Sequence, residues 1–406
     1  MKKLSVYGEH IVGSQIVKIS QQIKESNKYV QNFTVGDFNP TINPIPEELK
    51  EFIKEAYDDG VTNYPTSQGE ISLRNVISSQ LSKKGLEYNA DSILIGAGAR
   101  PLIYTLFKTI VESSDLVVYP VPSWNNDHYA FLHSCFKGEI ECKPENSFFP
   151  TVEDIKKYIH RARLICLCSP QNPTGRVIDK QLLKDICELI VEENKTRDEH
   201  HCYLFFDQIY SDLSNEDIVH PITVCPEIKD YTICIDGASK SLCATGIRVG
   251  WMFGPQEIIK KATEIFSHIG AWAPKPEQIG LANYMNSYHM ESFIYSKKKD
   301  YKKITDEICN LLKIMKKDGY FVDYQKPDGG IYIPIYLDYL DKFDVVEDYV
   351  NFLINKCGIG LVPFEFFGSK ENKGWFRLSI GSIDYDRIES VLDAIELAII
   401  KSHYKK

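Results

Sequence analysis

Short apolar runs recur between residues 93 and 254, and stretches with apolar residues at helical spacing separate them. An unbroken apolar run that ends in a turn is typical of a strand buried on both faces of a sheet. Apolar residues that recur every three or four positions are typical of a helix with one buried face. The pattern therefore predicts strands that alternate with helices, and the predicted strands cover residues 93–95, 116–119, 140–143, 164–168, 203–206, 231–235 and 251–254.

Turn residues and helical spacing mark the helices. Ser14 caps a short amphipathic helix over residues 14–28, and Pro101 suits the first position of a helix that follows a glycine-rich turn. A single long helix is expected over residues 278–315, and a smaller α/β unit follows it. The other expected helices cover 152–160, 179–193, 255–267, 345–356 and 386–400, and the strands of the smaller unit cover 321–324, 330–336 and 376–380.

The composition is that of a globular protein without an obvious nucleic-acid or membrane partner. The 406 residues are 43% hydrophobic and 25% charged, and the formal net charge is −9. The first residues lack the apolar core of a signal peptide, and no run approaches the roughly 18 apolar residues that a membrane span requires. We therefore expect a soluble, cytoplasmic protein.

The eleven cysteines are scattered and include no Cys-x-x-Cys pair. This spacing favours small buried thiols over disulfides or a metal site. No metal is expected.

Lys240 follows the apolar run 231–235 and stands among small residues, and Arg248 follows it between Gly246 and Gly250. A lysine near the end of a core strand can have a lowered pKa and attack a carbonyl as a neutral amine. A lysine on an exposed loop is the alternative when Lys240 is considered alone.

Other polar residues also sit in or directly after apolar runs. Asp207 ends one run, where an unpaired carboxylate would be costly, and Arg377 lies within another, where it needs an anion. Asn172 belongs to a proline- and glycine-rich turn after the strand at 164–168. The glycine-rich turn before Pro101 leaves backbone N–H groups at a helix start, which is an anion site.

These segments resemble those of the class I/II aminotransferases, the fold-type I enzymes that depend on pyridoxal 5'-phosphate (PLP). The resemblance rests on Ser239-Lys240 followed by Gly246-x-Arg248-x-Gly250, and the other motifs keep the family order from Gly36 to Arg377. It implies an α/β fold: a large domain with a mixed, mostly parallel sheet between helices, and a smaller C-terminal α/β domain. The expected division is an N-terminal arm over 1–45, a large PLP-binding domain over 46–285 and a small domain over 286–406.

The resemblance also implies a role for each matching residue. Lys240 would hold PLP and move protons, Asp207 would pair with the ring nitrogen, and Tyr210 and Asn172 would hold the phenolate oxygen; Lys240, Asp207 and Tyr210 are the expected catalytic residues. Trp124 would stack on the ring. The expected phosphate ligands are Gly98, Ala99, Arg100, Ser239, Arg248 and, from a neighbouring subunit, Tyr64; the expected substrate ligands are Gly36, Trp124, Asn172 and Arg377.

The expected activity is transfer of the amino group of an L-amino acid to a 2-oxo acid, with 2-oxoglutarate as the expected acceptor, by a ping-pong mechanism in a homodimer with shared active sites. A carbon–sulfur lyase of the same fold is the alternative, and a PLP-binding regulator without turnover is a further one. The aromatic residues Trp272, Phe364 and Phe366 favour a neutral or aromatic substrate side chain and leave aspartate open.

Overall fold

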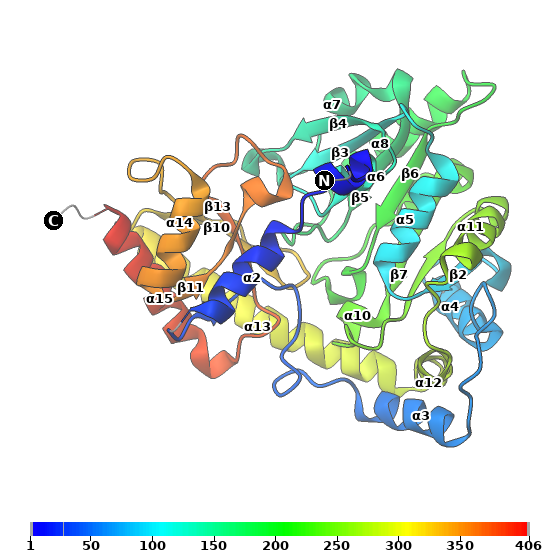
Figure 1. Ribbon diagram of the computed structural model, residues 1–406, viewed down its shortest axis with the longest axis horizontal. Coiled ribbons are helices and arrows are strands. Elements are labelled where there is room, and N and C mark those ends of the chain that lie inside the picture. Colours follow the sequence, from blue (N-terminus) through cyan, green and yellow to red (C-terminus); the bar gives the residue numbers. More distant parts are fainter. Residues whose placement is uncertain (1–2, 27, 404–406) are drawn as a thin grey trace.

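The computed structural model describes residues 3–26 and 28–403. Within this part of the chain, seven strands form one large sheet in the order β2-β8-β7-β6-β5-β3-β4 (Figure 1). Strand β8 is antiparallel to both its neighbours, and all the other pairs are parallel. The strands are β2 Ile93–Gly96, β3 Leu116–Val121, β4 Phe136–Glu141, β5 Ala162–Cys168, β6 Tyr203–Asp207, β7 Thr232–Gly237 and β8 Gly250–Phe253.

Both faces of this sheet are covered, as its apolar strands require. Successive residues of β5 show the alternation: Leu164 and Cys166 pack in a core with α5 and α11, whereas Ile165 and Leu167 pack in the core on the opposite face with α4 and α8. The helices around this sheet are α4 Ile71–Lys83, α5 Ala99–Ile110, α6 Asn126–Leu132, α7 Val152–Lys156, α8 Lys180–Asn194, α9 Pro221–Val224, α10 Ala238–Ser241 and α11 Gln256–Ile269.

A second, antiparallel sheet has the order β12-β13-β10-β9. Its strands and helices are β9 Val322–Tyr324, β10 Tyr332–Leu337, β12 Val362–Pro363, β13 Trp375–Ser379, α14 Val346–Phe352 and α15 Ile388–His403. The N-terminal segment joins this part of the molecule. Helix α2 (Gln15–Glu25) packs through Ile19 and Ile23 against Val350 and Ile354, and β1 (Gln31–Asn32) pairs with β11 (Ile359–Gly360).

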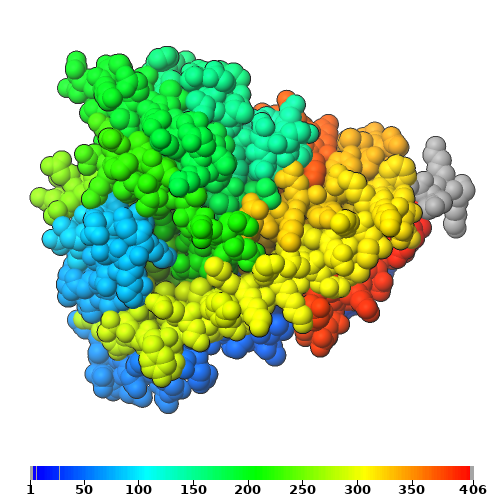
Figure 2. Space-filling view, turned by 180° about the vertical axis from the view of Figure 1, so that it is seen from behind, coloured from blue at the N-terminus to red at the C-terminus, as the bar shows by residue number. Residues whose placement is uncertain are grey.

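Helices α12 (Lys275–Met285) and α13 (His289–Lys317) replace the single long helix expected over 278–315. Helix α12 ends at Met285 and α13 begins at His289. Between them, the Ser287 hydroxyl donates to the Tyr284 carbonyl at 2.7 Å and accepts from the His289 N–H at 3.3 Å. Seen from behind, the two helices form a yellow-green to yellow band that runs from one part of the molecule to the other (Figure 2). The remaining helices are α1 Val6–His10 and α3 Glu47–Asp58.

The start of α5 also differs from the expectation. The helix begins at Ala99, and Gly98, at a φ of 82°, is its N-cap. Pro101 is therefore the third helical residue and not the first. Its missing N–H costs nothing there, because the first four N–H groups of a helix have no partner within the helix.

The fold class expected from the sequence is confirmed, whereas the division at residues 45 and 285 stays a prediction. All the cysteines except Cys135 and Cys168 are buried, and all are free thiols. Among the described residues, no helix has the length and hydropathy that a membrane crossing requires. The same residues contain no group of three or more His, Cys, Asp or Glu side chains placed to hold a metal ion.

Candidate active site

A cavity of about 430 Å³ lies where the strands of the large sheet end. Asp207 is the last residue of β6, Lys240 follows β7 within α10, and Asn172 follows β5. In open α/β sheets the carboxyl ends of the strands are where ligands bind. The residues proposed from the sequence that line this cavity are Gly36, Ala99, Arg100, Trp124, Asn172, Asp207, Tyr210, Ser239, Lys240, Arg248 and Arg377.

Lys240 is the cation at the centre of the cavity. Its Nζ donates a hydrogen bond to the Gly36 carbonyl. Burial lowers the pKa of Lys240 to about 8, although the Asp37 carboxylate acts in the opposite direction. The guanidinium groups that lower this pKa further are those of Arg377, Arg100 and Arg248. At pH 7 about a tenth of the amine is therefore neutral, a far larger share than for an exposed lysine, and the neutral amine is the nucleophilic form.

Asp207 is the anion of the same cavity. Burial raises the pKa of its carboxyl to about 6, and the Ile209 N–H and the Lys240 charge act against this rise. The Ile209 N–H donates to Asp207 Oδ1 at 3.1 Å. At neutral pH the carboxylate is therefore mostly ionised, and a cationic ligand group placed beside it would stabilise it further.

The start of α5 forms an anion site with Arg248. The guanidinium donates to the carbonyls of Ala97 at 3.0 Å and Thr245 at 2.7 Å. A Cβ atom at Gly98 would collide with that guanidinium, so glycine is required for this approach. Arg248 itself has a φ of 56°, which non-glycine residues adopt only where the surroundings hold them. Backbone N–H groups at a helix start and a fixed guanidinium are suited to a phosphate.

Arg377 lies in β13, across the cavity from the large sheet. It is 1% exposed, its guanidinium lies 4.4 Å from the ring centre of Tyr332, and it donates to Asn172 Oδ1 at 2.9 Å and to the Thr34 carbonyl at 2.5 Å. Burial lowers the pKa of Arg377. Its Nε is buried without a hydrogen-bond partner among the described residues. A buried guanidinium with an unsatisfied N–H is suited to a carboxylate.

Tyr210 and Tyr332 face each other with their hydroxyl oxygens 2.6 Å apart. Both side chains are buried, and burial raises the pKa of each phenol. Tyr332 was not among the residues proposed from the sequence, because a tyrosine in an apolar strand has the pattern of a core residue. Other cavity residues that sequence reasoning missed are Ser14, Ile16, Val17, Ser20, Val35, Asp37, Ile103, Ile209 and Thr245. Of these, Asp37 was the most detectable, as a carboxylate directly after Gly36.

Trp124 lines the cavity, as proposed, and the Arg100 guanidinium lies 5.1 Å from its ring centre. The three aromatic residues invoked for substrate preference do not line this cavity, so that interpretation was wrong for the cavity of a single chain. Phe364 is fully buried and packs against Phe148 and Trp375. Among the described residues, Trp272 and Phe366 do not line the cavity either.

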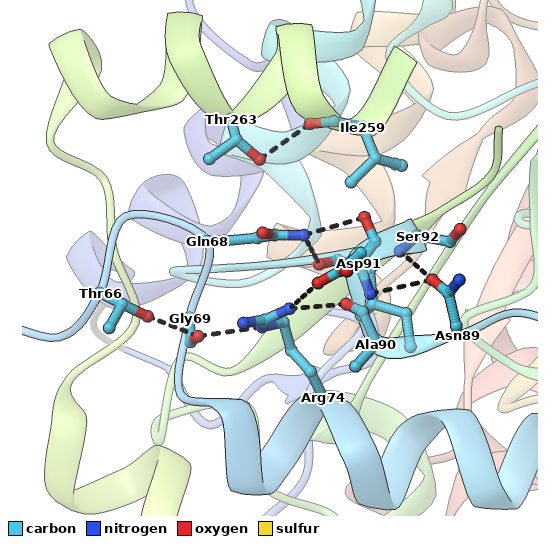
Figure 3. Close-up of polar contacts among 11 residues, drawn as sticks. Thr66, Gln68, Gly69, Arg74, Asn89, Ala90, Asp91, Ser92, Ile259 and Thr263 are labelled. Atoms are coloured by element: carbon cyan, nitrogen blue, oxygen red, sulfur yellow. Dashed lines mark hydrogen bonds and ion pairs between the residues drawn. The ribbon is translucent and has the colours of Figure 1, made fainter. Parts of the chain in front are cut away.

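Tyr64 does not reach the cavity of its own chain. Its side chain is 82% exposed, and its ring meets that of Trp272 edge-on at 5.8 Å. The loop that follows it is firmly attached, as Figure 3 shows: Gly69 O accepts from Thr66 Oγ1 at 2.6 Å and from Arg74 Nε at 3.1 Å. Arg74 Nη1 also donates to the Ala90 carbonyl at 2.7 Å. An exposed tyrosine on a fixed loop is available to a second subunit.

The cavity fits PLP in three respects. Lys240 can supply an amine for the aldehyde of PLP, Asp207 a carboxylate for the ring nitrogen, and the start of α5 with Arg248 a site for the phosphate. Two further features support the same assignment: Gly98 lets the Arg248 guanidinium approach the start of α5, and Arg377 Nε is a donor without a partner among the described residues.

This fold and this site define the class of the fold-type I transferases. The chain belongs to the aminotransferase class I and II family, whose sequence model matches residues 29–395. It is an aminotransferase.

Similar proteins of known name agree with this membership. A probable aspartate/prephenate aminotransferase of Aquifex aeolicus is 28% identical over 397 residues, which are 96% of this chain and 97% of that protein. A probable N-acetyl-LL-diaminopimelate aminotransferase of Bacillus subtilis is 28% identical over 361 residues, 88% of this chain and 86% of that protein. None of the relatives compared in this way favours a carbon–sulfur lyase.

Solved structures agree on the fold. The aspartate aminotransferase of Thermus thermophilus with maleate superposes with a TM-score of 0.87 at 22% identity, over 98% of this chain and all of that one. The aromatic aminotransferase of Pyrococcus horikoshii gives a TM-score of 0.81 at 23% identity, over 94% of this chain and 98% of that one.

Proposed function

We propose that the protein binds PLP through Lys240 and transfers the amino group of an L-amino acid to a 2-oxo acid, with 2-oxoglutarate as acceptor, by a ping-pong mechanism. The observation that carries the proposal is that Asp207, the last residue of β6, and Lys240, in α10 directly after the adjacent parallel strand β7, line one cavity. The charge of Lys240 lowers the pKa of Asp207 against the effect of burial, as expected for two groups of one site.

Asp207 keeps the ring nitrogen of the cofactor protonated through an ion pair. The bound cofactor then supplies an electron-withdrawing ring that stabilises the charge left when the substrate Cα loses its proton. Lys240 Nζ would hold the cofactor, and its free amine would take the proton from the substrate Cα and give it back during the transfer. Tyr210 and Asn172 hold the phenolate oxygen, and Trp124 stacks on the ring.

Arg377 binds the substrate α-carboxylate and so sets the direction of the Cα–H bond. Its bond to Asn172 connects carboxylate binding to the residue that holds the cofactor. Gly98, Ala99, the Arg100 N–H, Ser239 and Arg248 hold the phosphate, and Tyr64 of a neighbouring subunit contributes to it in a homodimer. Gly36 lies beside the α-carboxylate. The cytoplasmic location expected from the sequence stays a prediction.

We further propose a dicarboxylic substrate. Arg377 is assigned to the α-carboxylate and Arg248 to the phosphate, which leaves the Arg100 guanidinium, over Trp124 in the same cavity, for a second carboxylate. The names of the relatives support this choice, since several are aspartate aminotransferases.

Two experiments test the proposal. Purified protein should bind PLP with the absorbance of a lysine-linked cofactor, and Lys240→Ala should lose both that absorbance and turnover; turnover at the wild-type rate would refute the assignment.

A panel of amino donors with 2-oxoglutarate should show the highest kcat/KM for aspartate or glutamate. Arg100→Gln should reduce this value about tenfold for aspartate and little for alanine. Ammonia and pyruvate released from a cysteine conjugate without an oxo acid would select the lyase.

A further inference from the structure

A buried hydrogen bond joins two side chains that lie beside the catalytic residues but do not line their cavity. Gln208 follows Asp207, and Asp236 precedes Lys240 by four residues. Gln208 Nε2 donates to Asp236 Oδ2 at 3.0 Å. The two side chains are 3% and 6% exposed. Because neighbouring residues of a strand point to opposite faces, they lie behind the sheet when Asp207 faces the cavity.

This bond lies where β6 and β7 separate to form the site. Asp207 pairs with Ile235 in the last register position of these two strands, and the Gln208 N–H donates to the Ile235 carbonyl at 3.0 Å. Asp236 Oδ1 accepts from the Gly237 N–H at 2.7 Å. The Asp236 carboxylate therefore connects the residue after Asp207 with the backbone that leads into α10 and Lys240.

Several charged groups surround Asp236 behind the sheet. Lys84, at the end of α4, forms an ion pair with Asp212 at 2.7 Å. With Asp236, both line a second cavity, of about 390 Å³. Burial and the Asp212 charge raise the pKa of Asp236 to about 7, whereas Lys84, Gln208 and the Gly237 N–H act against this rise. A buried carboxylate is costly to keep, and the transfer reaction does not use this one.

Gln208 uses only one end of its amide here. Its Oε1 is buried without a hydrogen-bond partner among the described residues. An apolar side chain of similar size would avoid this cost, so the bond to Asp236 is what the amide contributes.

We propose that Gln208 and Asp236 are positioning residues that set the separation of the Asp207 carboxylate and Lys240 Nζ. The proposal rests on the proposed function, in which these two groups engage opposite ends of one cofactor molecule. A displacement of about 1 Å between such groups is enough to reduce a rate substantially. Neither residue contacts the reacting atoms, so both act through the strand ends that they join.

Three variants separate position from charge. Gln208→Met breaks the bond without changing charge, and Gln208→Glu places two carboxyl groups face to face. The double variant Gln208→Glu with Asp236→Asn restores a carboxylate–amide pair with donor and acceptor exchanged and the wild-type net charge. Asn194→Leu is the matched control, because Asn194 holds the other end of β6 through two hydrogen bonds with Cys202.

Each variant is loaded with PLP, and three properties are measured: the pH midpoint of the cofactor absorbance without substrate, the rate of cofactor dissociation, and kcat and KM. Gln208→Met and Gln208→Glu should lower kcat about tenfold with KM changed less than about threefold, and should move the midpoint by about one pH unit. The double variant should return to within about threefold of wild type. Asn194→Leu should lower the thermal unfolding temperature and leave the midpoint unchanged.

The possible outcomes distinguish the positioning role from an effect of charge and from failure of the proposed function. If Gln208→Met has the same kcat and pH midpoint as wild type, the proposal is overturned. An effect seen only in Gln208→Glu would then come from the added charge and not from the broken hydrogen bond. A double variant as impaired as Gln208→Glu would overturn it too. A wild-type protein that binds no PLP would refute the proposed function itself, whereas a normally loaded wild type with either of the first two results refutes the positioning role alone.

Discussion

Arg377 and Asn172 are joined by a 2.9 Å hydrogen bond that connects the smaller sheet to the turn after β5 of the larger one. A guanidinium can only donate, so Asn172 must turn its Oδ1 toward Arg377. The Nδ2 group of Asn172 is then available to donate within the cavity. The residue proposed for the substrate carboxylate thus determines how the residue proposed for the cofactor is oriented.

Replacement of Arg377 by lysine should therefore affect more than substrate binding. Lysine keeps the charge but cannot bond Asn172, the Thr34 carbonyl and a carboxylate in the same geometry. We expect Arg377→Lys to lower kcat/KM for the amino donor about a hundredfold, or about 2.7 kcal/mol. Steady-state kinetics measure this. Arg163→Lys, outside the cavity, is the control, and equal kinetics for the two variants would contradict the role of Arg377.

Asp37 should keep the pKa of Lys240 from falling further. Its carboxylate raises that pKa against the effect of burial, and it is held by the Thr245 hydroxyl at 2.6 Å. Asp37→Asn should therefore bring the Lys240 pKa below about 8. The pH dependence of PLP capture by the cofactor-free protein, followed by absorbance, should move to lower pH. Asp115→Asn, remote from the cavity, should leave this pH dependence unchanged. A shift to higher pH in Asp37→Asn would contradict the predicted effect of the Asp37 carboxylate on the Lys240 pKa.

The Asp207 carboxyl should cost the cofactor-free protein stability at neutral pH. Its pKa is about 6 in the folded chain, above the roughly 3.9 of an exposed aspartate. When the pKa of a carboxyl is raised by folding, its contribution to stability is fully present at pH values below its pKa in the unfolded chain. This contribution is lost as the pH rises through the pKa of the folded chain, about 6. A difference of about 2 pKa units corresponds to about 3 kcal/mol. The free energy of unfolding of cofactor-free Asp207→Asn should therefore be up to about 3 kcal/mol higher than that of wild type at pH 8 and equal to it below about pH 4. Urea unfolding at both pH values measures the difference, and a less stable variant at pH 8 would contradict it.

Tyr64 should act on the site of a partner subunit. Tyr64→Phe alone should lose about tenfold in kcat/KM, the cost of one hydrogen bond. When it is refolded together with an equal amount of inactive Lys240→Ala, the hybrid dimers each contain one intact site. The mixture should reach about a quarter of wild-type activity if half of the dimers are hybrids. If the activity of the mixture is only the mean of the activities of the two variants, Tyr64 acts within its own subunit or has no part in the mechanism.

Three of the residues that sequence reasoning placed correctly in the cavity share one property. Lys240, Asp207 and Arg377 are charged groups in or directly after apolar runs, where burial is costly without a partner. Tyr332 has no such signal, because its ring is apolar enough for a core. Thr34 contributes its backbone carbonyl, which side-chain patterns do not show.

The errors have equally local causes. The break between α12 and α13 covers residues 286–288, where the Ser287 hydroxyl bonds the backbone on both sides, and neither glycine nor proline marks it. Phe364 seemed a pocket residue from its place after a proline, yet it is enclosed by Phe148 and Trp375, which come from distant segments. Long-range packing of this kind leaves no trace in neighbouring residues.

The reversed direction of β8 determines how the ligand would be gripped. Gly237 at the end of β7 and Gly96 at the end of β2 both pair with Gly250 at the start of β8. The segment 238–249 between these strands therefore leaves and re-enters the sheet at the same edge, where a parallel strand would need a crossover to the opposite edge. Lys240 and Arg248, the residues proposed to hold the two ends of the cofactor, both belong to this one return segment, so a tilt of the segment would carry both in the same direction.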